Sequence, residues 1–173
     1  ILKKFGLNAQ LADLDDWKSV VQNQLNAKNV VKLKMVGKYM DLSDAYKSLN
    51  EALIHAGIRT LTHVDVEFID SVIIEADGVS VLEDADAILV PGGFGERGFE
   101  GKVIAAGFAR EKNIPYLGIC YGLHAAVVDI ARNKANLSRA DTTENNLDTP
   151  HHVIGILTQR PRQNGIKNER NKD

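Results

Sequence analysis

The stretch Pro115-Tyr116-Leu117-Gly118-Ile119-Cys120-Tyr121-Gly122 is an apolar strand pattern that turns at Gly-x-Cys-x-Gly and runs into a helical pattern. A reactive side chain on such a turn, with small neighbours that let the turn close, is typical of a nucleophile elbow. Cys120 is therefore expected at a helix start, where amide donors and the helix dipole favour the nucleophilic thiolate. The amide of Tyr121 is placed to donate to an oxyanion. A cysteine alone is more often a small buried hydrophobe, so it is this setting that favours catalysis.

Short apolar strands alternate with helical patterns along the rest of the chain. Helices are expected over 13–26, from a Ser43 cap to Gly57, over 99–111, and from the elbow to about 133; strands are expected over 30–37, 59–68, 87–90 and 114–120. Residues 69–86 show one helical turn at 79–82, residues 134–150 are polar, an apolar run covers 153–157, and Asn164-Gly165 predicts a hairpin. This alternation predicts an α/β fold: a doubly wound, mostly parallel sheet with helices on both faces.

Composition narrows the function classes. The 173 residues, 44% hydrophobic with a net charge of -2, suit one globular domain and give no electrostatic reason to expect nucleic acid or a membrane surface as partner. One cysteine cannot form an internal disulfide, which favours a reducing, cytoplasmic location. No apolar run approaches the roughly 20 residues of a membrane span, and no metal site is expected. Because the chain starts at Ile1 without a methionine or a signal-peptide pattern, we expect a piece of a longer protein.

A second motif, Pro91-Gly92-Gly93-Phe94-Gly95-Glu96-Arg97-Gly98, follows the strand over 87–90. Its spacing matches neither common phosphate-binding glycine motif, and a plain turn is a second interpretation. The third is that the amide of Gly93 supplies another oxyanion donor opposite Cys120. We favour the third because parallel strands bring their carboxyl ends to one edge of the sheet.

A cysteine that attacks an amide normally needs a histidine base oriented by a carboxylate. The five histidines are His55, His63, His124, His151 and His152. His124 lies one helical turn past Cys120, but the spacing of none of the five fixes it as a base. The sequence therefore predicts an incomplete catalytic site.

Four runs carry a family resemblance: Val36-Gly37-Lys38-Tyr39, Asp44-Ala45-Tyr46-Lys47-Ser48, residues 87–98 and residues 114–120. Together they resemble the C-terminal class I glutamine amidotransferase domain of the CTP synthase family, from about Phe5 to roughly Thr158. The resemblance implies a flavodoxin-like sheet. It also implies an interdomain linker helix over 1–28 and an amidotransferase domain over 29–173 that is incomplete at its C-terminus.

Site roles follow from this resemblance. Cys120 would attack the side-chain amide of L-glutamine, and the backbone amides of Gly93 and Tyr121 would hold the oxyanion. Glu144 matches the glutamate that binds the substrate's amino group, and Phe94 matches a residue that lines the pocket. His124 stands where the family has a glutamine that contacts the substrate.

The resemblance also implies partners. Ammonia would pass to an N-terminal synthetase domain that converts UTP to CTP with ATP and Mg²⁺, with GTP as allosteric activator, in a homotetramer. The amidotransferase domain itself would bind no cofactor, and the Lys38–Asp44 loop resembles a lid near the interface between the two halves. The family's triad histidine and glutamate would lie beyond Asp173, so we expect this chain alone to be inactive, with exposed apolar surface that causes low solubility or dimerisation.

Two alternatives stay open at this point. One is a stand-alone γ-glutamyl cysteine hydrolase, which needs neither a synthetase domain nor UTP. The other is a catalytically dead binding or regulatory module that uses the same pocket or the helix around Trp17 for association.

Overall fold

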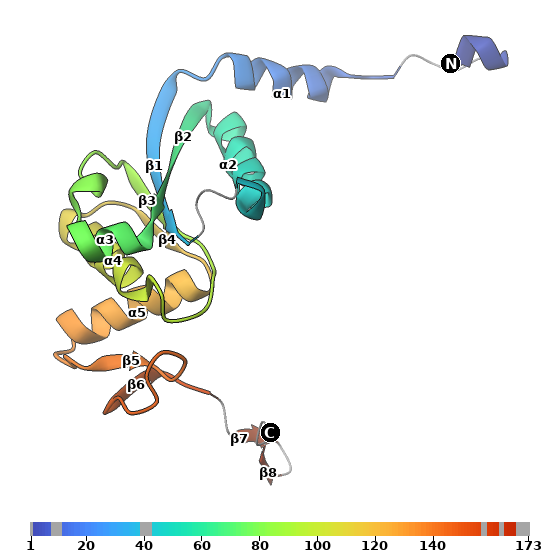
Figure 1. Cartoon of the computed structure of the whole chain (residues 1–173). Helices are drawn as coiled ribbons and strands as arrows, with labels where there is room; N and C mark the ends of the chain where they lie inside the picture. The colour runs from blue at the N-terminus through green and yellow to red at the C-terminus, as the bar shows by residue number, and fades with distance from the viewer. Residues whose placement is uncertain (1, 8–11, 39–42, 157–158, 163–164, 169–173) are drawn as a thin grey trace. The chain divides into compact units, whose positions relative to one another are not determined.

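The computed structural model describes residues 2–7, 12–38, 43–156, 159–162 and 165–168 (Figure 1). The chain divides into two compact units, one formed by residues 1–31 and 43–65 and the other by residues 32–42 and 66–173. The first unit contains a 3-10 turn at Leu2–Phe5, α1 (Asp15–Leu25), a 3-10 turn at Ser43–Tyr46, and α2 (Lys47–Thr60). Helix α1 begins with Asp15 and Asp16, which favour a helix start, and it contacts α2.

The expectation that α2 stops at Gly57 is wrong, because the helix continues to Thr60. Glycine is required at position 57 for close packing and not to end the helix, because a Cβ atom there would lie 2.5 Å from the carbonyl oxygen of Thr62. The chain leaves the helix at Leu61, in a left-handed conformation with φ 53°. The expected cap is also displaced, since the residue that precedes the helix is Tyr46 and not Ser43.

The sheet consists of β1 (Asn29–Gly37), β2 (Thr62–Asp70), β3 (Ala87–Val90) and β4 (Tyr116–Gly118), in the order β2-β1-β3-β4. Strand β3 is parallel to both β1 and β4. This order is the beginning of the flavodoxin-like arrangement 2-1-3-4-5. The predicted α/β fold with a mostly parallel sheet is confirmed.

The helices of the second unit pack together and onto the strands. Helix α4 (Phe99–Lys112) contacts both α3 (Ser71–Asp77) and α5 (Tyr121–Asn133), and α4 and α5 also contact β3 and β4 (Figure 1). Arg110 on α4 donates from Nε and Nη2 to the buried carboxylate of Asp129 on α5, at 2.8 and 3.2 Å. This bidentate ion pair fixes the two helices that flank the elbow strand.

Helix α3 lies in the segment that the sequence pattern left unassigned. Its N-cap is Asp70, whose side chain accepts a hydrogen bond from the amide of Val72 at 3.0 Å. An aspartate directly before a short apolar run is a helix-start signal, so this helix was predictable from its cap. The 3-10 turn at Ser80–Leu82 agrees with the single helical turn expected there.

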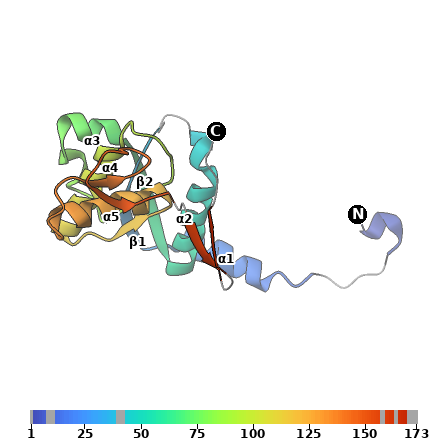
Figure 2. The same ribbon diagram turned by 90° about the horizontal axis from the view of Figure 1, so that it is seen from below.

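After α5 the chain forms two small sheets. Strands β5 (Ala140–Thr142) and β6 (His151–Ile154) pair in parallel and contact α5, as Figures 1 and 2 show from two directions. Strand β5 was not predicted because it lies in a polar stretch, yet its three residues are buried. Strands β7 (Gln159–Arg162) and β8 (Gly165–Asn168) pair antiparallel around residues 163–164, which lie outside the described residues, and this pairing confirms the predicted hairpin.

No helix within the described part of the chain is both long enough and apolar enough to span a lipid bilayer.

Candidate active site

Cys120 lies on a sharp turn between the end of β4 and the start of α5. Its backbone has φ 54° and ψ -111°, an unfavourable conformation for a residue with a Cβ atom, and its side chain is exposed. Two backbone hydrogen bonds hold the turn: Ile119 N to Val90 O at 2.9 Å, and Gly122 N to Ile119 O at 3.0 Å. The strained backbone thus presents the thiol to solvent, as a nucleophile elbow requires.

The two glycines of the Gly-x-Cys-x-Gly motif are required by close packing. A Cβ atom at Gly118 would lie 2.6 Å from the carbonyl carbon of Gly122, and one at Gly122 would lie 2.1 Å from the carbonyl oxygen of Val90. Any larger residue would push α5 away from β3 and β4. The motif therefore needs glycine at both positions because the start of α5 lies so close to β3 and β4.

The glycine loop after β3 lies against the elbow. A Cβ atom built on Gly92 would be 3.5 Å from Cys120 Cβ and 3.9 Å from its Sγ, and Gly93 and Gly95 have φ values of 135° and 94° that favour glycine. On the other side of the thiol, Tyr121 is the first residue of α5, and its amide is one of the helix-start donors without an intrahelical acceptor. The structure therefore brings together the elements from which both oxyanion donors were predicted.

Two buried lysines bind the carbonyl groups of this loop. Lys38, just after β1, donates to Phe94 O at 3.0 Å and to Gly95 O at 2.7 Å, and Lys102 on α4 donates to Gly93 O at 3.2 Å. Burial lowers the pKa of Lys38, and the Arg97 guanidinium lowers it further. Lys38 was expected in a family motif and in a lid, whose residues 39–42 lie outside the described part of the chain, but no contact with the glycine loop was predicted for it.

Lys102 was missed altogether. One feature of the sequence could have indicated it: Lys102 lies on the same face of the predicted helix as the apolar residues Phe99 and Val103, and all three are buried.

Tyr121 contributes more than its amide. Its ring is fully buried, with centroids 5.5 Å from Phe94, 4.9 Å from Phe99 and 5.2 Å from His124. Its hydroxyl donates to the side-chain oxygen of Asn145, and burial raises its pKa above the ordinary value. This residue therefore ties the elbow to the loop that carries the neighbouring Glu144.

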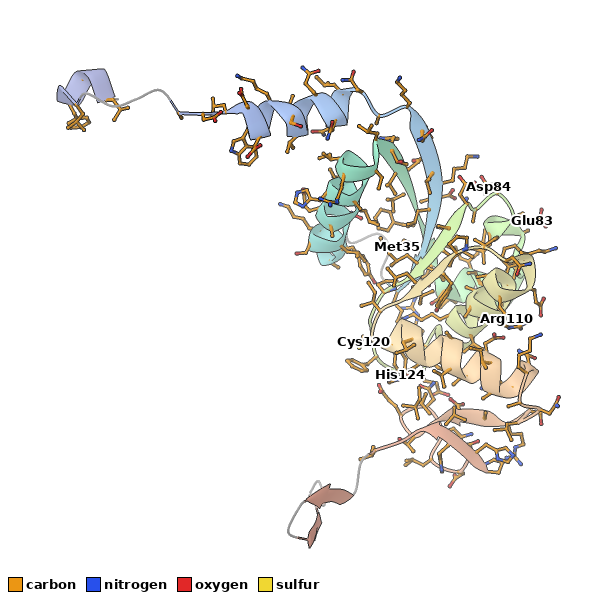
Figure 3. The ribbon with its side chains drawn as sticks, turned by 180° about the vertical axis from the view of Figure 1, so that it is seen from behind. Met35, Glu83, Asp84, Arg110, Cys120 and His124 are labelled. Atoms are coloured by element: carbon orange, nitrogen blue, oxygen red, sulfur yellow. The ribbon has the colours of Figure 1, made fainter. Side chains whose placement is uncertain are left out.

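Glu144 meets the glycine loop, because its Oε1 accepts a hydrogen bond from the amide of Gly95 at 3.2 Å. Glu144 and His124 line a hollow of about 420 Å³, together with Thr142, Thr143, Ile154, Gly155 and Ile156. Figure 3 shows Cys120 and His124 side by side at the start of α5. The Nδ1 atom of His124 is buried and has no hydrogen-bond partner among the described residues.

The other histidines are exposed: His55 and His63 in the first unit, and His151 and His152 on β6. Nε2 of His152 lies 3.0 Å from Leu147 O. Within the described ranges, no group of three or more histidine, cysteine, aspartate or glutamate side chains is arranged to hold a metal ion.

Residues 41–170 match the family model described as "Glutamine amidotransferase class-I". The chain belongs to this family. Among solved structures, this amidotransferase is similar to the glutaminase domain of Trypanosoma brucei CTP synthase with bound acivicin, at 34% sequence identity and a TM-score of 0.70. The match covers 79% of this chain and 54% of the other, so the amidotransferase described here spans about half the length of that relative.

These matches confirm the resemblance inferred from the motif runs. The predicted boundary between residues 28 and 29 stays a prediction, as do the individual roles of the site residues. What the amidotransferase geometry offers chemically is an exposed thiol between a helix-start amide and a glycine loop. The same loop binds the Glu144 carboxylate, which lines the hollow with His124.

Proposed function

We propose that this chain is the glutaminase part of a CTP synthase and releases ammonia from glutamine for the amination of UTP. One observation carries the proposal: the exposed Cys120 thiol sits on a strained turn against the glycine loop. Membership of the class I amidotransferases and the similarity to a CTP synthase glutaminase domain support it.

The chemistry is an acyl transfer through sulfur. The Cys120 thiolate adds to the side-chain amide carbon of glutamine, and the oxyanion accepts hydrogen bonds from the amides of Tyr121 and Gly93. The carbon–nitrogen bond then breaks as the nitrogen gains a proton, which releases ammonia and leaves a thioester. Water cleaves the thioester to glutamate and restores the thiol. The resemblance assigns the base, a histidine oriented by a glutamate, to residues outside these 173.

Substrate recognition falls to the groups around the hollow. The Glu144 carboxylate binds the ammonium group of glutamine, and Phe94, whose side chain is 65% exposed, covers the substrate. His124 offers its unpartnered Nδ1 where the family has a glutamine side chain. The ammonia passes to a synthetase domain that uses ATP, Mg²⁺ and UTP and is activated by GTP, in a cytoplasmic homotetramer.

The test is CTP formation from UTP by the full-length protein. With glutamine as nitrogen donor, Cys120→Ala abolishes CTP formation, whereas ammonia-dependent formation persists because the synthetase site is untouched. The matched control is Cys120→Ser, which keeps the shape of the elbow and is also expected to lose the glutamine-dependent activity.

Two results contradict the proposal. Hydrolysis of γ-glutamyl compounds without a synthetase domain or UTP would indicate the stand-alone hydrolase. A Cys120 thiol in the full-length protein that reacts with acivicin no faster than free cysteine does would indicate an inert module.

A further inference from the structure

Lys102 is a buried cation without an anionic side chain to pair with. It is fully buried on α4, and no carboxylate of the described residues lies within ion-pair distance of its Nζ. By contrast, the buried Lys34 binds both Glu67 and Asp84, the latter at 2.8 Å. Burial of an ammonium group is costly, so an unpaired one needs a reason.

The surroundings of Lys102 provide only partial negative charge. Its Nζ donates to the carbonyl of Gly93 at 3.2 Å and lies 5.6 Å from the centroid of the Tyr121 ring. Two carboxylates that reach α4 and the glycine loop are already engaged, because Glu75 on α3 accepts from the amide of Gly101, and Glu144 accepts from the amide of Gly95.

Two ionisable groups act on the Lys102 charge. Burial and, to a smaller extent, the Lys38 ammonium lower the pKa of Lys102 to about 8, against an opposing effect of Cys120. At neutral pH the lysine is therefore mostly protonated. The glycine loop that Lys102 binds at Gly93 O also lies against the thiol, because a Cβ atom built on Gly92 would be 3.9 Å from Cys120 Sγ, so the buried positive charge lies on the Cys120 side of the loop.

We propose that Lys102 is the internal counter-ion of the elbow, a positioning residue that fixes the oxyanion side of the glycine loop and stabilises negative charge on Cys120. This role rests on the proposed glutaminase function. With Lys38 it turns the carbonyls of Gly93, Phe94 and Gly95 toward two ammonium groups, which fixes the loop backbone beside the thiol. When the oxyanion forms next to Gly93, the buried cation is already in place, and little reorganisation is needed.

The test uses the reactivity of Cys120, the one cysteine of the chain, so that iodoacetamide labelling reports on this thiol alone. Lys102→Met removes the charge at similar volume, Lys102→Gln leaves a neutral donor, and Lys102→Arg keeps the charge. Lys112→Met, an exposed position at the end of the same helix, is the control. Circular dichroism establishes that each variant is folded.

We expect the alkylation midpoint of Lys102→Met to rise by about one pH unit and its rate at pH 7 to fall roughly tenfold, because the thiolate loses its counter-ion. Lys102→Gln is expected to show the same changes as Lys102→Met. The alkylation rates of Lys102→Arg and Lys112→Met at pH 7 are expected to stay within about threefold of the wild-type rate. A folded Lys102→Met or Lys102→Gln whose pH profile coincides with that of the wild type overturns the proposal.

This readout needs neither glutamine nor UTP, so it separates the two proposals. If the alkylation midpoint shifts in the Lys102 variants but the full-length protein makes no CTP, the counter-ion proposal stands and the CTP synthase function is refuted. In the full-length enzyme, Lys102→Met is expected to lower kcat for glutamine hydrolysis more than it raises KM, while ammonia-dependent CTP formation persists.

Discussion

At the scale of single residues, Lys102 links stability to reactivity. A depression of its pKa from 10.5 to about 8 corresponds to about 3 kcal/mol of destabilisation while the lysine is protonated. Unfolding relieves this cost, because the exposed lysine regains its ordinary pKa. The group that we expect to activate the thiol is therefore one that weakens the fold.

Replacement of Lys102 by Met is expected to stabilise the chain at pH 7. The expected rise in the free energy of unfolding is about 1–3 kcal/mol, less than the full electrostatic cost because Gly93 O loses its donor. Between pH 8 and 10.5 the unfolded chain binds more protons than the folded one, so wild-type stability rises with pH and the advantage of the variant shrinks. Urea denaturation at neutral and at alkaline pH measures both values. A variant less stable than the wild type at pH 7, or an equal gain at both pH values, would contradict this prediction.

At the scale of elements, the contact between α5 and β3 decides whether the elbow forms. Gly122→Ala places a Cβ atom where the carbonyl oxygen of Val90 lies, and the backbone must shift to admit it. We expect a loss of more than about 3 kcal/mol in the free energy of unfolding, together with altered labelling of Cys120. Chemical denaturation and iodoacetamide labelling test the two effects.

Gly155→Ala is the matched control. Its added Cβ atom would lie 3.6 Å from Cγ2 of Thr143, which is an ordinary van der Waals contact. The control is expected to change stability by less than about 1 kcal/mol. If both substitutions are equally tolerated, close packing is not the reason for the glycine spacing.

At the scale of the whole molecule, the elbow strand lies at one edge of the sheet and leaves apolar side chains uncovered. Leu117 on β4 and Leu123 on α5 are each 56% exposed, and the amide of Leu123 adjoins Gly118. An apolar sheet edge of this kind promotes association.

We therefore expect the 173-residue chain to form dimers or larger species as its concentration rises. Light scattering coupled to size exclusion measures the mass, and Leu117→Glu combined with Leu123→Glu should shift it toward the monomer. Lys112→Glu, at the exposed end of α4, serves as a control that leaves the association unchanged. A wild-type chain that remains monomeric at every concentration would refute this expectation.

The sequence alone determined the α/β class, the elbow, the position of the glycine loop and the family, because these depend on local steric rules and on motif spacing. The spacing of Gly118, Cys120 and Gly122 was enough to predict the elbow, although the contact that requires Gly122 is with Val90 on β3. The end of α2 was wrongly predicted for a related reason: Gly57 satisfies a tertiary contact with Thr62, while the sequence pattern interprets glycine as a helix stop.

Only the tertiary structure decided which groups surround the thiol. Lys38 and Lys102 reach the same three-residue loop from a strand end and from a helix, and Tyr121 reaches Asn145 across the elbow. Such contacts join residues far apart in the chain, and no local pattern encodes them. The electrostatic environment of Cys120 therefore depends on the packing of α4 and β1. The nucleophile itself is predicted by eight consecutive residues, 115–122.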